Sequence, residues 1–338
     1  MPCEHRRQVT RFFRPMRGRC TLDTVRLGVE TSSLERTLGK VDGRLVAELE
    51  SLSVDSLWVG GHVASTNPTP ESIVALTRLA TMSNKAHVGT SVLLLPLYQP
   101  AIIAKQLADL DRACDGRLIV GVGVGGEYPS EFEACGVPLE GRGRRTDEAL
   151  RLIRQLWTAQ PIDHHGEFFD FSGVRIHPPP AQNGGPPLVV AGRRTVAMRR
   201  AALLGDGWMP YLYSPSRYAA SVAQIHAMAA SAGRSLDDFG WYAYVFINCG
   251  PDGDLARKQM ASWLGGSYRQ DFEEMLSHVA VFGTPESVRA RLQEFVDSGA
   301  RHFIAVAAGH PDPVKMYGEL AEIVIPSLEI PKPQPTGV

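Results

Sequence analysis

The chain has 338 residues, of which 44% are hydrophobic, and a formal net charge of −1. This composition is sufficient for one large α/β domain or two smaller ones, and the charge argues against binding to nucleic acid or an anionic membrane. No apolar run approaches the ~18 residues that span a bilayer, and five dispersed cysteines indicate reduced thiols in a cytoplasmic protein.

The first 22 residues are rich in arginine and lack the apolar region of a secretory signal. We expect residues 1–22 to form a disordered leader, or to result from a start codon placed upstream of Met16; a basic docking arm is the alternative. The domain itself is expected over residues 23–330, followed by a proline-rich tail over residues 331–338.

Eight apolar segments, several of them apolar on both faces, predict strands buried beneath helices. They are residues 25–29, 56–60, 86–94, 117–124, 187–192, 206–210, 241–249 and 302–308. The intervening segments have helical periodicity, as in Ile103, Leu107 and Leu110 on one face. Eight β-α alternations over ~300 residues predict an α/β protein with a single (β/α)8 TIM barrel.

Two helix starts are marked by Thr-Pro-Glu, at residues 69–71 and 284–286. We expect each threonine to be the N-cap and each proline the first helical residue. Gly299 fits the end of the second of these helices.

Two insertions interrupt the alternation, one after helix 4 and one after strand 7. Residues 161–187 predict a hairpin and a proline-rich crossover. Here His164 and His165 point to opposite faces of an extended segment, so we expect solvated side chains and no metal site. The second insertion begins at Pro251 and carries apolar side chains that fit either core packing or the wall of a pocket: Trp263, Tyr268, Phe272 and Met275.

Gly121, Gly123 and Gly126 have the G-x-G-x-x-G spacing of a dinucleotide-binding turn. That turn normally follows the first strand of its unit, whereas this one follows the fourth. No acid ends the next strand about 20 residues on, and the glycines lead into the loop residues 127–129 rather than directly into a helix. Glycines at the end of a barrel strand have another use, since they let a flat ring approach the backbone.

Longer stretches around these glycines resemble a known superfamily. Residues 121–157 read GVGVGGEYPSEFEACGVPLEGRGRRTDEALRLIRQLW, and residues 186–210 read PPLVVAGRRTVAMRRAALLGDGWMP. Together with DSLWVGGHV (55–63) and VGTSVLLLPLYQPAIIAKQLADLD (88–111), they are similar to the bacterial luciferase-like monooxygenase superfamily. The resemblance runs from about Val25 to Leu328 and is strongest to the branch that uses coenzyme F420, a deazaflavin.

The resemblance implies a cofactor site at the ends of several strands. It implies a cis peptide bond between Ser91 and Val92, supporting the central ring of the cofactor. It places the cofactor beside a glycine-rich loop of Gly123, Val124, Gly125, Gly126 and Glu127. It places the phosphate at the start of a helix, on Ala191, Gly192, Arg193 and Arg194, where free amides and a cation attract an anion. A solvated loop carboxylate at Glu127 and a solvated arginine pair are the alternatives.

His62 matches the histidine that faces the reactive ring in similar deazaflavin enzymes, and Gly61 precedes it where some of those enzymes have aspartate. We expect His62 to be catalytic, with Glu127 as a second catalytic candidate and Gly61 beside the cofactor. Near neutral pH an imidazole can donate or accept a proton. A merely exposed loop histidine is the alternative reading.

The resemblance therefore implies an F420-dependent oxidoreductase that transfers a hydride to or from a small organic substrate. An FMN-dependent monooxygenase on the same scaffold is the first alternative, and a non-catalytic barrel that binds a phosphorylated metabolite is the second. A homodimer is common among similar proteins.

Overall fold

A computed structural model describes residues 24–268 and 271–331, apart from the side chain of Tyr268. The leader expected over residues 1–22 lies outside the described residues, as does the expected tail after its first residue. Within the described range, no helix is long and apolar enough to cross a membrane.

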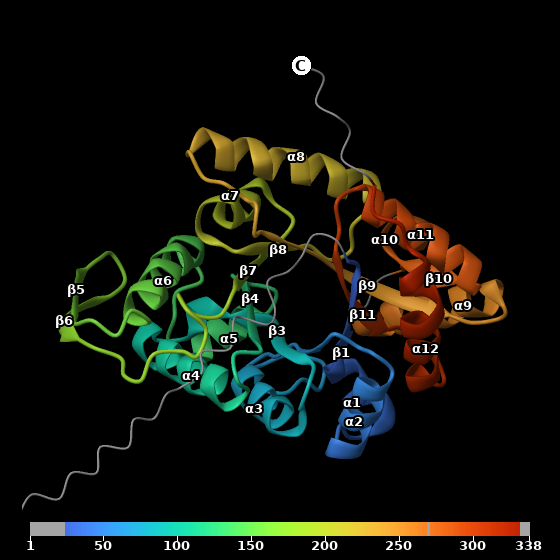
Figure 1. The fold of residues 1–338 in the computed structure, drawn as a ribbon, viewed down its shortest axis with the longest axis horizontal. Coiled ribbons are helices and arrows are strands. Elements are labelled where there is room, and N and C mark those ends of the chain that lie inside the picture. The colour runs from blue at the N-terminus through green and yellow to red at the C-terminus, as the bar shows by residue number, and fades with distance from the viewer. Residues whose placement is uncertain (1–23, 269–270, 332–338) are drawn as a thin grey trace, which may run out of the picture.

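Eight parallel strands of the described chain close into a barrel surrounded by helices (Figure 1). The pairing follows chain order and closes through β8 against β9 and β11 against β1. All eight predicted strands are confirmed: β1 (Arg26–Glu30), β2 (Ser56–Val59), β3 (His87–Leu94), β4 (Leu118–Gly123), β7 (Leu188–Ala191), β8 (Gly207–Met209), β9 (Gly240–Cys249) and β11 (His302–Ala307).

The helices pack around the barrel on the residues that form their apolar faces, such as Ile103, Leu107 and Leu110, all buried. Their bounds are α1 (Thr31–Leu38), α2 (Gly43–Ser51), α3 (Ser72–Met82), α4 (Pro100–Ala113), α5 (Pro129–Ala134), α6 (Arg142–Leu156), α7 (Thr195–Leu204), α8 (Pro215–Ser231), α9 (Gly253–Tyr268), α10 (Leu276–Val279), α11 (Pro285–Asp297) and α12 (Pro313–Glu319), with short 3-10 or π turns at Leu95–Leu97, Leu320–Val324 and Ile325–Ser327.

One of the two predicted helix starts is confirmed and the other is wrong. Thr284 caps α11, accepting a hydrogen bond from the amide of Ser287, and Gly299 lies just beyond its end with φ of +106°. By contrast, α3 begins at Ser72 with Glu71 as N-cap. The carbonyl of Pro70 accepts the backbone amide of His62, which holds Pro70 in the preceding loop instead of in the helix.

The first insertion forms the predicted hairpin of β5 (Ile162–His165) and β6 (Asp170–Val174), which projects at the edge of the molecule (Figure 1). The two histidines contact different partners, as opposite faces require. The expected solvated side chain is found at His165, which is 68% exposed, whereas His164 is only 22% exposed. His164 contacts Glu148 at 2.9 Å, and His165 contacts Asp170 at 2.7 Å.

The second insertion contains α9, α10 and a further short strand, β10 (Val281–Gly283), which pairs with β9 and was not predicted. Phe272 is buried in a small apolar cluster beside the barrel, so its role is packing. Trp263 lies at the edge of this cluster beneath the guanidinium of Arg36, 4.4 Å from the ring centroid, while Met275 is 42% exposed. Tyr268 cannot be assigned to either interpretation because its side chain lies outside the described residues.

The inside of the barrel is filled by side chains, as in other barrels of this size. Its core consists of Trp58, Ile119, Val189, Met209, Tyr242 and Ile304. Val92 and Tyr244 pack on this core and are partly exposed. Val92 lies nearer the carboxyl end of β3, and Tyr244 lies two residues beyond the core residue Tyr242 along β9. They therefore form an apolar floor at the C-terminal mouth of the barrel.

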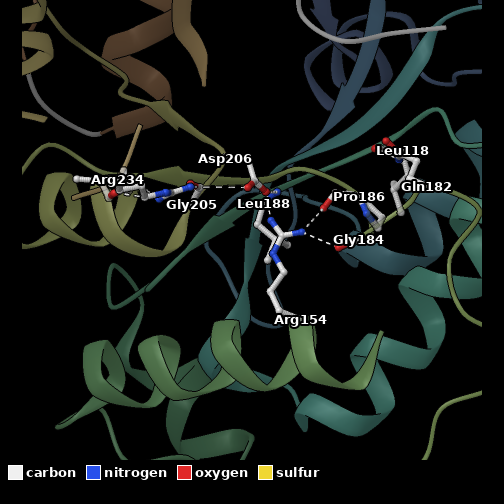
Figure 2. A network of polar contacts seen from close by, with 11 residues as sticks. Leu118, Arg154, Gln182, Gly184, Pro186, Leu188, Gly205, Asp206 and Arg234 are labelled. Atoms are coloured by element: carbon white, nitrogen blue, oxygen red, sulfur yellow. Dashed lines mark hydrogen bonds and ion pairs between the residues drawn. The ribbon is translucent and has the colours of Figure 1, made fainter. Parts of the chain in front are cut away.

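Asp206 organises the opposite, N-terminal rim of the barrel (Figure 2). Its carboxylate accepts the amide of Leu188 at 2.7 Å and a hydrogen bond from Arg154 on α6, and Arg234 approaches it at 3.9 Å. Burial, with a smaller effect of Arg234, lowers the pKa of Arg154 to about 10. This network joins α6, the start of β8 and the loop that follows α8, far from the mouth, where barrel residues serve stability.

Candidate functional site

The structure brings the predicted site segments onto neighbouring strand ends. His62 follows β2, Ser91 and Val92 lie in the second half of β3, and residues 123–127 and 191–194 end or follow β4 and β7. These four strands lie side by side in that order. Because parallel strands of a barrel end at one face, all four segments border the C-terminal mouth, where barrel enzymes build their active sites.

The peptide bond between Ser91 and Val92 is cis, which confirms the prediction. It lies in an irregular part of β3, where the register with β4 shifts between Thr90 and Leu93. Among the described residues, the Ser91 hydroxyl is one of the few buried side-chain groups without a hydrogen-bond partner. Buried polar groups are normally paired, so this unpaired hydroxyl is an exception.

The glycines at the end of β4 and just after it have two roles: Gly123 allows close packing against β3, and Gly125 and Gly126 form a turn. A Cβ atom on Gly123 would lie 2.6 Å from a methyl group of Val92. Gly125 and Gly126 have φ of +61° and +103°, a region that favours glycine. Arg142 holds this turn, donating from Nε to the carbonyl of Gly125 at 3.2 Å.

His62 is held at the edge of the mouth by a buried carboxylate that the sequence analysis did not identify. Its Nδ1 lies 3.2 and 3.3 Å from the two carboxylate oxygens of Glu131, on α5. The Glu131 side chain is completely buried, whereas 22% of the His62 side chain is exposed. Tyr128 packs edge-on against the imidazole, with ring centroids 5.0 Å apart.

The loop that carries His62 fits tightly against α3. A Cβ atom on Gly61 would lie 2.4 Å from the hydroxyl oxygen of Ser72 and 2.7 Å from the carbonyl oxygen of Pro70. An aspartate at this position could not be accommodated without moving this loop. Gly61 is buried in this contact, and its expected position beside the cofactor stays a prediction.

Glu127 and Glu131 lie four residues apart but differ in environment. Glu127 is exposed in the loop after β4, while Glu131 faces His62 and also accepts the amide of Val63 at 3.2 Å. Burial and the Glu131 carboxylate raise the pKa of the nearby Cys135 thiol. Nothing in the residue type distinguishes the two glutamates; the available signal was the position of Glu131 in the first turn of a short helix, beside the apolar Phe132.

The arginines expected to attract phosphate lie at the start of α7. Gly192, with φ of +136°, directly follows β7, and its carbonyl accepts the indole N–H of Trp208 at 2.9 Å. The guanidinium of Arg193 lies over the ring of Tyr211, 4.5 Å from its centroid, whereas Arg194 is exposed. The first amides of an α-helix have no partner within the helix, so this terminus can bind an anion.

No group of three or more histidine, cysteine, aspartate or glutamate side chains in the described chain is arranged to hold a metal ion. The polar groups of the mouth are instead a histidine with its carboxylate, an unpaired hydroxyl and a cationic helix start. This set can bind an anionic ligand at one side and exchange a proton at the other.

The model of one family, described as luciferase-like monooxygenase, matches residues 30–302. The chain belongs to the luciferase-like monooxygenase family. An uncharacterised protein of Mycobacterium bovis is 33% identical over 168 residues, which cover 50% of this chain and 57% of that relative. An F420-dependent glucose-6-phosphate dehydrogenase of Mycobacterium avium is 25% identical over 280 residues, which cover 74% and 80% of the two chains.

Among solved structures, this luciferase-like fold matches the oxygenating constituent of 3,6-diketocamphane monooxygenase of Pseudomonas putida, in complex with FMN. The TM-score is 0.72 at 18% sequence identity, and the match covers 91% of this chain and all of the other. At this identity the likeness concerns the fold.

Proposed function

We propose that the protein is a coenzyme F420-dependent oxidoreductase that transfers a hydride to or from a small organic molecule. Family membership and the F420-dependent relative support this proposal. The observation that carries it is the arrangement of the mouth. An apolar floor at Val92 lies between His62, after β2, and the cationic start of α7, after β7.

The residues of the mouth fit such a cofactor. The unpaired Ser91 hydroxyl is available to a polar edge of the ring, and Val92 and Tyr244 offer an apolar surface beneath a flat ring. Arg193 and the free amides of α7 suit its phosphate. When bound, the deazaflavin supplies the hydride chemistry.

The chain's own contribution is positioning and proton transfer. His62 has Nδ1 directed to Glu131, which leaves Nε2 to give a proton to the substrate or take one from it. A glycine-lined β4 end and the packed β3 keep the floor fixed. The substrate class within small organic molecules, a homodimer and a cytoplasmic location stay predictions from the sequence.

Fluorescence titrations with F420 and, separately, with FMN test this proposal. We expect saturable binding of F420, and weaker or no binding of FMN. An FMN-dependent monooxygenase would give the reverse preference, and a barrel that binds only phosphorylated metabolites would bind neither. Tight binding of F420 that is unaffected by Arg193→Ala would contradict the phosphate position while leaving the cofactor assignment intact.

A further inference from the structure

We propose that Glu131 is a positioning residue that fixes the tautomer and the orientation of the His62 imidazole. This inference rests on the proposed function for its effect on turnover, but its structural half can be measured without any cofactor. A completely buried carboxylate lies at the rim of the mouth, directly against the imidazole ring that we expect to move a proton.

A buried carboxylate must be compensated by hydrogen bonds, since transfer of an unpaired charge from water is very costly. Glu131 has such bonds from two donors on one loop. Oε2 accepts the amide of Val63 at 3.2 Å, and both oxygens lie within 3.3 Å of His62 Nδ1. The carboxylate therefore holds two successive residues of the loop that follows β2.

These contacts determine which nitrogen of His62 carries the proton. An ionised carboxylate only accepts hydrogen bonds, so Nδ1 must be the donor and the neutral ring must keep its lone pair on Nε2. The Tyr128 ring, edge-on at 5.0 Å, restricts rotation of the imidazole about its axis. A defined tautomer with one free nitrogen is what a proton-transfer histidine requires.

Two features separate this role from simple loop anchoring. A loop anchor needs only the bond to the amide of Val63, and the loop already has other attachments. The amide of His62 donates to Pro70 at 3.2 Å, and Gly60 exchanges hydrogen bonds with the Ser32 side chain at 3.2 Å. The contact from Glu131 to the imidazole does not constrain the backbone of the loop further, but it fixes the orientation of the His62 ring.

Glu131→Gln tests the proposal because glutamine has nearly the same shape. Its single carbonyl oxygen can still accept the hydrogen bond from the amide of Val63. The NH2 group of the glutamine then faces Nδ1 of His62, which favours a proton on Nε2. Glu133→Gln is the matched control, since Glu133 is exposed on the same helix. Thermal unfolding of both variants shows whether the fold is retained, and Glu131→Asp, which keeps the charge, replaces the glutamine variant if that one does not fold.

The first readout is the 15N chemical shift of the His62 ring nitrogens in the ligand-free protein, assigned by comparison with His62→Ala. We expect Nδ1–H in the parent and in Glu133→Gln, and a change toward Nε2–H in Glu131→Gln. The same tautomer in all three proteins would overturn the proposal, whatever cofactor the protein uses.

The second readout is turnover with F420 and a substrate. We expect Glu131→Gln to lower kcat by about 10²-fold, the low end of the contribution of a positioned acid–base group, with F420 affinity within about threefold. In a His62→Ala background the same substitution should have no further effect on kcat. A full additional loss in that background would show that Glu131 does not act through His62.

Discussion

Gly121 on β4 lies so close to Thr90 on β3 that a Cβ atom at Gly121 would stand 2.0 Å from the Thr90 carbonyl oxygen. The Thr90 hydroxyl also donates to the Gly121 carbonyl at 2.7 Å. The first glycine of the G-x-G-x-x-G spacing is thus explained by contact between two strands. The presence of glycine at position 121 therefore does not require binding of a dinucleotide phosphate.

Gly121→Ala should therefore destabilise the barrel rather than act on ligand binding alone. We expect the free energy of unfolding to fall by at least about 1–3 kcal/mol, the usual cost of overpacking, because the clash is with backbone that cannot turn away. Urea unfolding measures this. Gly43→Ala is the control, since no atom lies within 4 Å of its added Cβ; equal stability of the two variants would contradict the packing explanation.

The Asp206 network at the N-terminal rim predicts a loss of stability without loss of function. Asp206→Ala removes the acceptor of the Leu188 amide and of Arg154. We expect a loss of about 2 kcal/mol, the range for hydrogen bonds to charged groups, reduced by the partial exposure of the pair. Asp109→Ala, which removes only the exposed partner of Lys105, should cost less than about 0.5 kcal/mol. Cofactor affinity should be unchanged in both.

Stability should decline as the pH falls below about 6.5. Burial, with smaller effects of Arg26 and His87, holds the pKa of His302 well below its ordinary value of 6.5. Below that value the unfolded chain takes up a proton that the folded chain refuses, so the free energy of unfolding falls by up to about 1.4 kcal/mol per pH unit for this group.

Urea unfolding at several pH values between 5 and 7 measures whether the free energy of unfolding falls as the pH is lowered. His302→Gln should have a shallower dependence on pH than the parent, although burial also lowers the pKa of His87 and of His310, which keeps part of the slope. His177→Gln, at an exposed position, should keep the parent slope. A parent stability that is constant or rises toward pH 5 would contradict this account.

The strands of the barrel could be predicted because a buried parallel strand is apolar on both faces, as in Leu118–Gly123. Short elements in the second insertion could not. Val281–Gly283 is a strand because it pairs with β9. Three residues are too few to show an alternating or apolar sequence pattern of their own. The start of α3 was misplaced because the contact from Pro70 to His62 joins two loops that local capping rules do not consider.

The site was predictable where a motif marks a backbone feature, as with the cis bond after Ser91. It was not predictable where burial decides the role of a side chain. Glu127 and Glu131 are both acids after the same strand, but only the tertiary fold turns Glu131 toward His62 and leaves Glu127 in solvent.

The phosphate position predicts a specific loss of cofactor affinity. Replacing Arg193 and Arg194 together by alanine should weaken F420 binding by roughly 1–3 kcal/mol per lost charge-assisted contact. Arg193 should account for most of it, because its guanidinium is held over Tyr211 while Arg194 is exposed. Arg199→Ala, exposed on the same helix, is the control for net charge. Unchanged affinity in the double variant would place the phosphate elsewhere.

His62 should serve the chemical step more than cofactor binding. It lies beside the mouth with Nδ1 on Glu131, while the expected phosphate contacts lie at the start of α7, beyond β3, β4 and β7 in the sheet order. His62→Ala should therefore lower kcat by ~10²–10⁴-fold, the range for general acid–base catalysis, with a much smaller change in F420 affinity. Steady-state kinetics and fluorescence titration separate the two quantities.

The His62→Ala variant also leaves the buried Glu131 carboxylate without its imidazole partner, so the stability of this variant must be measured as well as its turnover. His62→Gln keeps a group that can accept or donate a hydrogen bond but cannot gain a proton near neutral pH. If that variant is as stable as the parent and still loses turnover, the loss belongs to proton transfer. Turnover within a few-fold of the parent in both variants would falsify the assignment of His62, and the exposed Glu127 beside the same mouth would be the next residue to replace.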